Sequence, residues 1–208
     1  MPTLANMQNV NGITIAAGAD VTTDRHILLG TQTASSSATL SFSGINSHRS
    51  DVLRSSFDVL EFRFENMHPA SDGVQFQFQV NAAGQTGFNE VMTTTLFRAV
   101  HDEANTTAFL AYYDLDQAQG TAYQAIGLVG GDADESTSGV LTLYAPSSTT
   151  YVKHFTSRTN GYWSTNYSME FHTAGYINTT AAIDEISFKM SAGNIDAGVI
   201  KMYGIAKA

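Results

Sequence analysis

Alternation of apolar and polar residues is the clearest pattern in this chain. From Val74 to Val80 the apolar side chains are separated by Gln at every second position, and from Leu60 to Phe64 they alternate with Glu and Arg. Successive side chains of a β-strand point to opposite faces, so both segments are expected to form half-buried strands. The turn-forming residues of Asn66–Gly73 predict that these two strands are antiparallel neighbours.

Shorter segments rich in β-branched and aromatic residues predict further strands. They are Thr39–Ser43, Ala108–Asp114, Val140–Ala145, Met169–His172, Ile186–Met190 and Val199–Ile205. Only Gln117–Ile126 and Gly87–Val91 could hold a helical turn, and neither has an apolar repeat of 3.6 residues. The expected fold class is therefore all-β, an antiparallel two-sheet β-sandwich that is jelly-roll-like, with eight or so strands.

The length of 208 residues fits one such domain with a substantial core. We expect this β-sandwich domain to span residues 26–208. Residues 1–25 contain few large apolar side chains and are expected to form an N-terminal arm or irregular lead-in, which reaches a neighbour or covers a sheet edge. The first residues have neither a basic start nor an apolar run, so we expect no signal peptide and no membrane segment.

Composition narrows the classes of function. The formal net charge is −9, with only 10 Lys and Arg residues, so we expect no nucleic-acid partner. Cysteine is absent, which excludes thiolate chemistry and disulfides. Charged residues make up 14% of the chain, which predicts a neutral polar surface suited to a packed assembly. No cofactor is expected.

Few residues in the sequence form a pattern that indicates catalysis or metal binding. The loop with Asp132 and Asp134 could bind calcium through its carboxylates, although a solvated loop is the commoner structure for such a sequence. His101–Glu103 lacks the spacing of metal ligands and is interpreted as a polar turn. No G-x-S-x-G nucleophile motif is present. A glycosidase-like pair of carboxylates, with Asp58, Glu61 or Glu65 near Glu170, is the remaining enzymatic hypothesis, and no catalytic residue is assigned.

Aromatic residues are dense between Tyr144 and Tyr176, among Asn, Thr and Ser side chains. Rings beside small hydrogen-bonding groups are typical of sugar recognition, and they also fill cores and subunit interfaces. We favour the core or interface interpretation. Under the alternative, the glycan-binding residues would be Trp163, Tyr162 and Tyr167, although Trp163 is expected at a strand start rather than in an open groove.

Two blocks of sequence resemble small β-rich virion structural proteins of tailed bacteriophages. They are Phe62–Val74, with its His-Pro turn, and Ser191–Ile205, with the pattern S-x-G-N-I-x-x-G-x-I-x-x-Y-G-I. In the second block, Gly193 and Gly198 are expected to allow positive φ before a closing strand. These blocks cover under a seventh of the chain.

The resemblance implies a role in the virion, for a protein made in the host cytoplasm. The leading hypothesis is a non-catalytic capsid decoration or cement protein that docks on the capsid lattice and reinforces it. Its implied partners are other copies of itself, in a homotrimer, and virion proteins such as the major capsid protein or tail proteins. The alternatives are a tail-associated receptor-binding module for host surface glycan and, third, a glycan-cleaving enzyme.

Overall fold

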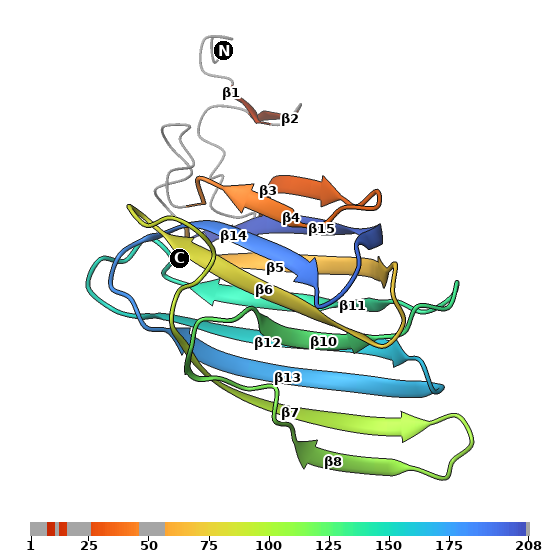
Figure 1. Cartoon of the computed structure of the whole chain (residues 1–208). Coiled ribbons are helices and arrows are strands. Elements are labelled where there is room, and N and C mark those ends of the chain that lie inside the picture. The colour runs from red at the N-terminus through yellow and green to blue at the C-terminus, as the bar shows by residue number, and fades with distance from the viewer. Residues whose placement is uncertain (1–7, 11–12, 16–25, 46–56, 207–208) are drawn as a thin grey trace.

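The protein is built from two antiparallel sheets of unequal width (Figure 1). The computed structural model describes residues 8–10, 13–15, 26–45 and 57–206. The broad sheet has nine strands, in the order β3 (His26–Thr33), β15 (Ile195–Ala206), β5 (Phe57–Pro69), β11 (Thr137–Tyr144), β12 (Lys153–Trp163), β13 (Tyr167–Ile177), β7 (Met92–Asp102) and β8 (Ala108–Tyr112), with β9 (Ala118–Gly120) also paired to β7. The narrow sheet has the order β10 (Gln124–Val129), β6 (Val74–Ala82), β14 (Ile183–Met190) and β4 (Leu40–Ser43).

The two-sheet antiparallel sandwich predicted by the alternating pattern is confirmed. The chain crosses repeatedly between the sheets, for example from β5 to β6 and from β13 to β14, as it does in jelly rolls. The described residues contain no helix. Consequently none of them forms a helix long and apolar enough to cross a membrane.

The prediction that β5 and β6 pair with each other is wrong. β5 lies between β15 and β11 in the broad sheet, whereas β6 lies between β10 and β14 in the narrow one. Their apolar faces meet across the core, where the rings of Phe64 and Phe76 are 5.0 Å apart. Both strands alternate because each has one buried face, and alternation does not report which strand is the hydrogen-bonded neighbour.

Several strands are longer than the sequence indicated, and the structure contains additional strands that it did not indicate. β3, β7, β10 and β12 were not predicted. Gln117–Ile126, one of the two segments that could have held a helical turn, contains β9 and the start of β10. In β12 the inward positions include Ser157 and Thr159, so hydrophobic alternation is weak there even though both side chains are buried. Their hydroxyls donate to the backbone oxygens of Val140 and Ile126, respectively.

The predicted N-terminal arm, residues 1–25, lies mostly outside the described residues. What the structure describes of it is a short hairpin, β1 (Gln8–Val10) paired with β2 (Ile13–Ile15), which forms a two-stranded sheet of its own.

A cluster of phenylalanine rings joins the sheets at the centre of the core. Phe188 of β14 lies 5.6 Å from Phe62 and 5.3 Å from Phe64 between ring centroids, and 6.0 and 6.5 Å from Phe76 and Phe78. These side chains are almost completely buried. Edge-to-face and offset contacts at such separations add to the hydrophobic stabilisation of the buried area. The cluster therefore fixes how the narrow sheet sits on the broad one.

The narrow sheet covers only part of the broad sheet, and β7 and β8 extend beyond it (Figure 1). A second, smaller apolar cluster lies toward this side and contains Leu96, Val100, Leu128, Met169 and Phe171. It is closed by partly buried side chains rather than by more strands: Tyr113, Leu115, Trp163 and Tyr167. These four side chains, three of them aromatic, thus cover the part of the broad sheet that the narrow sheet does not reach.

One buried cation stabilises the loops at the start of β12. Lys153 is 0% exposed, and its Nζ donates to the backbone oxygens of Tyr151, Thr179 and Thr180 at 3.1, 3.3 and 2.9 Å. An ammonium group has three donors, and all three are used here. Burial lowers the pKa of Lys153 because desolvation disfavours its charged form. The residue is a structural clamp.

Replacing Phe188 with Ala is expected to lower the free energy of unfolding by about 3–5 kcal/mol, because it removes a buried ring and leaves a cavity between the sheets. Denaturant unfolding measures this change. Tyr151→Ala is the control, since Tyr151 is 73% exposed and its loss should change stability by no more than about 0.5 kcal/mol. Equal effects of the two substitutions would contradict the central role of the cluster.

Candidate functional site

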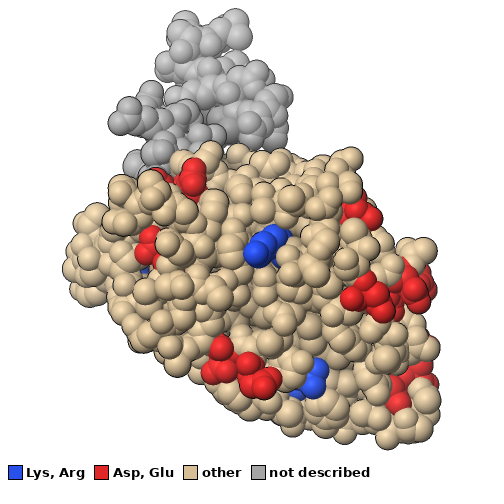
Figure 2. Space-filling view, viewed as in Figure 1, with Lys and Arg blue, Asp and Glu red and all other residues tan. Residues whose placement is uncertain are grey.

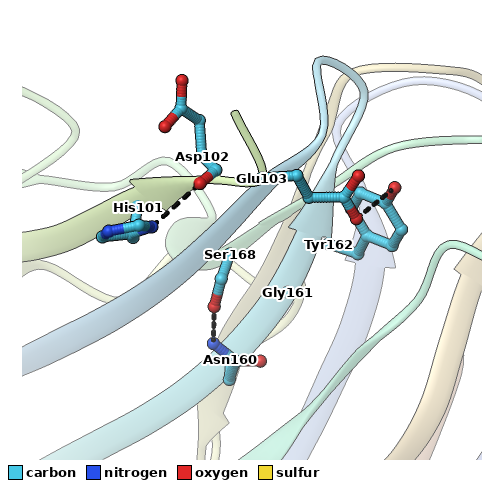
Figure 3. Close-up of a pocket in the computed structure, with 7 residues that line it drawn as sticks. All are labelled: His101, Asp102, Glu103, Asn160, Gly161, Tyr162 and Ser168. Carbon is cyan, nitrogen blue, oxygen red and sulfur yellow. Dashed lines mark hydrogen bonds between the residues drawn. The ribbon is translucent and has the colours of Figure 1, made fainter. Parts of the chain in front are cut away.

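A pocket of about 420 Å³, lined mostly by polar residues, opens where β7 and β12 end and β13 begins (Figure 3). It is lined by residues of these three strands and of the loop after β7: His101, Asp102, Glu103, Asn160, Gly161, Tyr162 and Ser168. The strand register brings them together, because Ser168 of β13 pairs with Tyr162 on one side and with His101 on the other. These three side chains form a row on the outer face of the broad sheet, away from the core.

Two tight turns hold the rim of the pocket. Asn166 ends the turn between β12 and β13 with φ 60°, and Asn105 lies in the loop after β7 with φ 56°. Asn is one of the few residues that adopt this left-handed conformation readily. The N–H of Glu103 donates to the backbone oxygen of Asn166 at 3.1 Å, which ties the two turns together. Glu103 is thereby placed over the end of β12.

Asp102 organises the loop after β7 from its buried position at the end of that strand. Its Oδ1 accepts hydrogen bonds from the N–H groups of Thr106 and Thr107 at 2.8 and 2.9 Å, and its Oδ2 accepts one from the Thr106 hydroxyl. These bonds favour the carboxylate, so the pKa of Asp102 is lowered, with the Thr106 hydroxyl as the largest cause. The ionised side chain thus shapes the loop that carries Glu103.

The pocket presents a mixed set of hydrogen-bonding groups beside an aromatic ring. The Tyr162 hydroxyl donates to Glu103 Oε1 at 3.2 Å, and Asn160 Nδ2 donates to Ser168 Oγ at 3.1 Å (Figure 3). Partial burial, followed by the bond to Glu103, raises the pKa of Tyr162, so this phenol stays protonated and remains a donor. Amide, hydroxyl and carboxylate groups around one ring suit a small polar ligand with several hydroxyls.

The three aromatic residues proposed for glycan binding do not gather at this pocket. Tyr162 lines it, but Trp163 and Tyr167 pair with each other on the opposite, inner face and pack on the second apolar cluster. Trp163 is also the last residue of β12, not the first of a strand as expected. Neighbouring residues of a strand face opposite sides, so Tyr162 and Trp163 cannot contact one ligand.

The acidic loop after β10 contains both predicted calcium ligands, Asp132 and Asp134, as exposed side chains. The third carboxylate of this loop, Glu135, is 3% exposed and accepts a hydrogen bond from the N–H of Asp132 at 2.8 Å. Among the described residues, no group of three or more His, Asp or Glu side chains is placed to hold a metal ion. Calcium binding at Asp132 and Asp134 stays a prediction from sequence alone.

The proposed glycosidase-like pairing of carboxylates with Glu170 does not form. Asp58, Glu61 and Glu65 are all in β5, Glu170 is in β13, and β11 and β12 lie between these strands. Three inter-strand spacings separate such residues by roughly 14 Å. Carboxylate pairs in glycosidases are about 5–9.5 Å apart.

Sequence reasoning missed most of the pocket. His101–Glu103 was interpreted only as a polar turn, and Asn160 and Ser168 were not selected. Their alternation around the turn of Ser164–Asn166 is the signal that could have placed Asn160, Tyr162 and Ser168 on one face of a hairpin.

The outer face of the nine-stranded broad sheet carries paired charges. All ion pairs formed within the described part of the chain lie here: Glu61 with Arg63 and His26, Glu65 with Lys201, and Glu170 with Arg158 and His172. Arg63 also stacks over the Tyr203 ring, with its guanidinium carbon 4.8 Å from the ring centroid. Each cation has an acidic neighbour, so the face has little net charge.

Fold and surface together define an antiparallel two-sheet β-sandwich with a polar pocket at one end of a charge-paired sheet face. No protein-family model matches this chain, and neither a curated protein nor a solved structure is significantly similar to it.

Asp102→Asn is expected to destabilise the protein at neutral pH, and this loss should shrink in acid. The lowered pKa of Asp102 means that the folded state favours the carboxylate, so its contribution is present above the unfolded value of 3.8 and disappears as the pH falls through the lower folded value. Urea midpoints of both proteins from pH 7 to below 3.8 measure the difference. Thr106→Val, which removes the hydroxyl donor, should give a smaller effect of the same sign. A difference that is constant with pH would contradict this role.

Proposed function

We propose that this chain is a non-catalytic virion structural protein of a tailed bacteriophage, a capsid decoration or cement protein that docks through the outer face of its broad sheet. The pairing of charges on this face carries the proposal. An uncompensated charge buried at a protein interface is costly, whereas a face that neutralises its own ions can lie against a partner without that penalty. These Lys–Glu and Arg–Glu pairs are neutral, so the net charge of −9 comes from residues outside them.

The other side of the molecule differs in character. Figure 2 views the side with the narrow sheet and shows acidic side chains in small separate groups toward the periphery, with few cations. Acidic groups that stay in water keep copies soluble before assembly. We infer that this side faces solvent in the particle, while the outer face of the broad sheet contacts the capsid.

The two blocks that resemble phage virion proteins are one structural unit, which supports the same proposal. Although far apart in sequence, the blocks contain the later part of β5 and almost all of β15, and these two strands pair along most of their length. Gly198 has φ 119° at a register shift in β15, and a Cβ there would lie 2.7 Å from the backbone oxygen of Asn66. Gly193 has φ 68°, as expected from the sequence. The resemblance therefore covers a local packing arrangement and not two unrelated strands.

The proposed mechanism is mass action. A protein that binds only the assembled shell stabilises that shell in proportion to occupancy, and each docked copy adds buried interface area. Identical copies would tile against each other around a symmetry axis of the lattice, and the homotrimer implied by the resemblance is part of this proposal.

Purified particles of a phage whose genome encodes this chain should contain hundreds of copies of it, measured by quantitative gel or mass spectrometry. A handful or a few dozen copies would place the protein in the tail instead. Its absence from purified particles would overturn the virion role.

Two variants test the docking face, each with one added positive charge on the outer face of one of the two sheets. Thr156→Lys adds an unpaired cation to the outer face of the broad sheet, where Thr156 is exposed, and should lower incorporation into particles about tenfold or more. Gln75→Lys adds the same charge to the outer face of the narrow sheet, at a position that is not opposite a lysine, and should leave incorporation unchanged. The reverse result would assign docking to the narrow sheet.

The pocket at Tyr162 supports a second candidate function, recognition of a host surface glycan by a tail-associated module. Its ring, amide, hydroxyl and carboxylate groups are the observation that favours this alternative. Glycan recognition would then use Tyr162 with Asn160 and Ser168, and not Trp163 or Tyr167.

Tyr162→Ala should weaken binding to host surface polysaccharide about tenfold if the pocket recognises it, because the ring and its hydroxyl donor are both lost. Tyr144→Ala is the matched control, since Tyr144 is 40% exposed and lies on a different strand of the broad sheet. Titration of both variants with purified polysaccharide, followed by NMR, measures the effect. No binding by the unaltered protein would remove this candidate.

A further inference from the structure

The edge of the broad sheet at β8 is open and apolar. β8 pairs with β7 on one side, and Figure 1 shows no element beyond it on the other. Its five residues, Ala-Phe-Leu-Ala-Tyr, contain no charge and no proline. Natural sheet edges are normally protected by charged side chains, proline, bulges or covering loops. β8 has neither charged side chains nor proline, and its pairing with β7 shows no register shift that would indicate a bulge.

The hydrogen bonds identify which backbone groups of β8 are free. The N–H of Asp102 donates to the oxygen of Thr107, and the N–H of Tyr113 donates to the oxygen of Leu96, both at 3.0 Å. In an antiparallel pair, hydrogen-bonded residues alternate with residues whose N–H and C=O point the other way. The unshifted register therefore directs the N–H and C=O groups of Ala108, Leu110 and Tyr112 away from β7, toward the open edge.

Large apolar side chains surround this edge. Leu110 is 70% exposed, Tyr112 62%, Phe97 42% and Phe109 41%, which makes four of the large exposed apolar residues of the described chain neighbours on β7 and β8. Leu110, Tyr112 and Phe97 share the outer face, because Phe97 pairs with Tyr112 and Ala99 with Leu110. Contiguous apolar surface beside unpaired backbone groups marks a site for strand addition.

The sequence of β8 is complementary to itself in one antiparallel register. With Leu110 opposite Leu110 of a second copy, Ala108 faces Tyr112 and Phe109 faces Ala111, so each aromatic ring meets a methyl group. The free N–H and C=O groups of Ala108, Leu110 and Tyr112 then fall in hydrogen-bonded positions, and the pairing forms six inter-chain hydrogen bonds.

Charge favours the same register. In a chain of net charge −9, two copies approach with least repulsion at an uncharged edge. Continuing the register past the strand places Asp114 opposite Thr106 and Asp116 opposite Ala104 of the other copy, so no acid faces an acid. The contact is isologous, which means that it closes on itself and does not propagate into a fibre.

We propose that two copies of this chain associate through β8, in antiparallel register centred on Leu110, and join their broad sheets into one continuous sheet. The pairing has a twofold axis perpendicular to the sheet, and it leaves the outer faces of both copies on the same side. It goes beyond the proposed virion role and does not depend on it, because it is a property of the purified chain. A higher oligomer formed elsewhere on the surface is compatible with it.

Sedimentation equilibrium of the purified protein, from micromolar to millimolar concentration, should show a species of twice the mass of the chain. Leu110→Lys places two ammonium groups opposite each other at the twofold axis and should lower the association constant about tenfold or more. Tyr151→Lys is the matched control, because it adds the same charge at a side chain of similar exposure outside β7 and β8, and it should leave association unchanged.

Leu110→Pro tests the backbone contribution without disturbing β7. The N–H that it removes points to the open edge, and proline is tolerated at edge positions of this kind, so the melting temperature should change little while association falls about tenfold or more. Hydrogen exchange supplies a third readout. The amides of Ala108, Leu110 and Tyr112 should become protected as the protein concentration rises.

The proposal is overturned by a chain that stays monomeric at millimolar concentration, or by association that survives both Leu110 substitutions. Protection of the β8 amides only after another virion protein is added would assign the edge to that partner and would also overturn self-pairing. Absence of the chain from phage particles would count against the virion role and leave these solution measurements unaffected.

Discussion

Two stacked sheets exclude water from the space between them only where both are present, and here one sheet has nine strands and the other four. The phenylalanine cluster around Phe188 fills the part that both sheets cover. Among the described residues, the narrow sheet has no strand beyond β10 to cover the inner face of the broad sheet. Trp163, Tyr167, Tyr113 and Leu115 close that side instead, so the sole tryptophan packs on the second apolar cluster. The difference in width also leaves β7 and β8 as a projecting margin.

The sequence predicted strands well and their partners poorly, for a physical reason. Alternation reports that one face of a segment is buried, which identified β5 and β6, but both faces of a sandwich core give the same signal. The incorrect pairing of these strands follows from that ambiguity. β12 was missed because its inward Ser157 and Thr159 are polar, and only the structure shows the carbonyl oxygens that satisfy them. The burial of such residues depends on contacts distant in sequence.

The pocket shows which parts of a site can be predicted from the alternation of residues along neighbouring strands and from the turn between them. The alternation of faces along β12 would have separated Tyr162 from Trp163, and the three-residue turn would have placed Ser168 beside Tyr162, although neither signal was used. The third wall could not be predicted, because β7 joins β13 only through the sheet order. Asp102 is a second example. The sequence indicated only that it belongs to a polar turn with His101 and Glu103, whereas the three hydrogen bonds that its carboxylate accepts show that it shapes the loop.

The two surfaces of the broad sheet that we propose as interfaces avoid charge in different ways. On the outer face, Arg63, Arg158 and Lys201 are each held by a glutamate of the same or the adjacent strand, so a partner meets ions whose charge is already compensated. At β8 no charge is present, and the backbone itself supplies the unsatisfied groups. A face with paired charges can contact a partner over a large area but does little to fix the partner's orientation. A strand edge fixes the alignment of the partner strand, because its free hydrogen-bonding groups occur at alternate residues. A protein that must lie on a lattice and also align with its neighbour requires both properties, and in this fold they occur on the same sheet because its projecting margin is not covered by the narrow one.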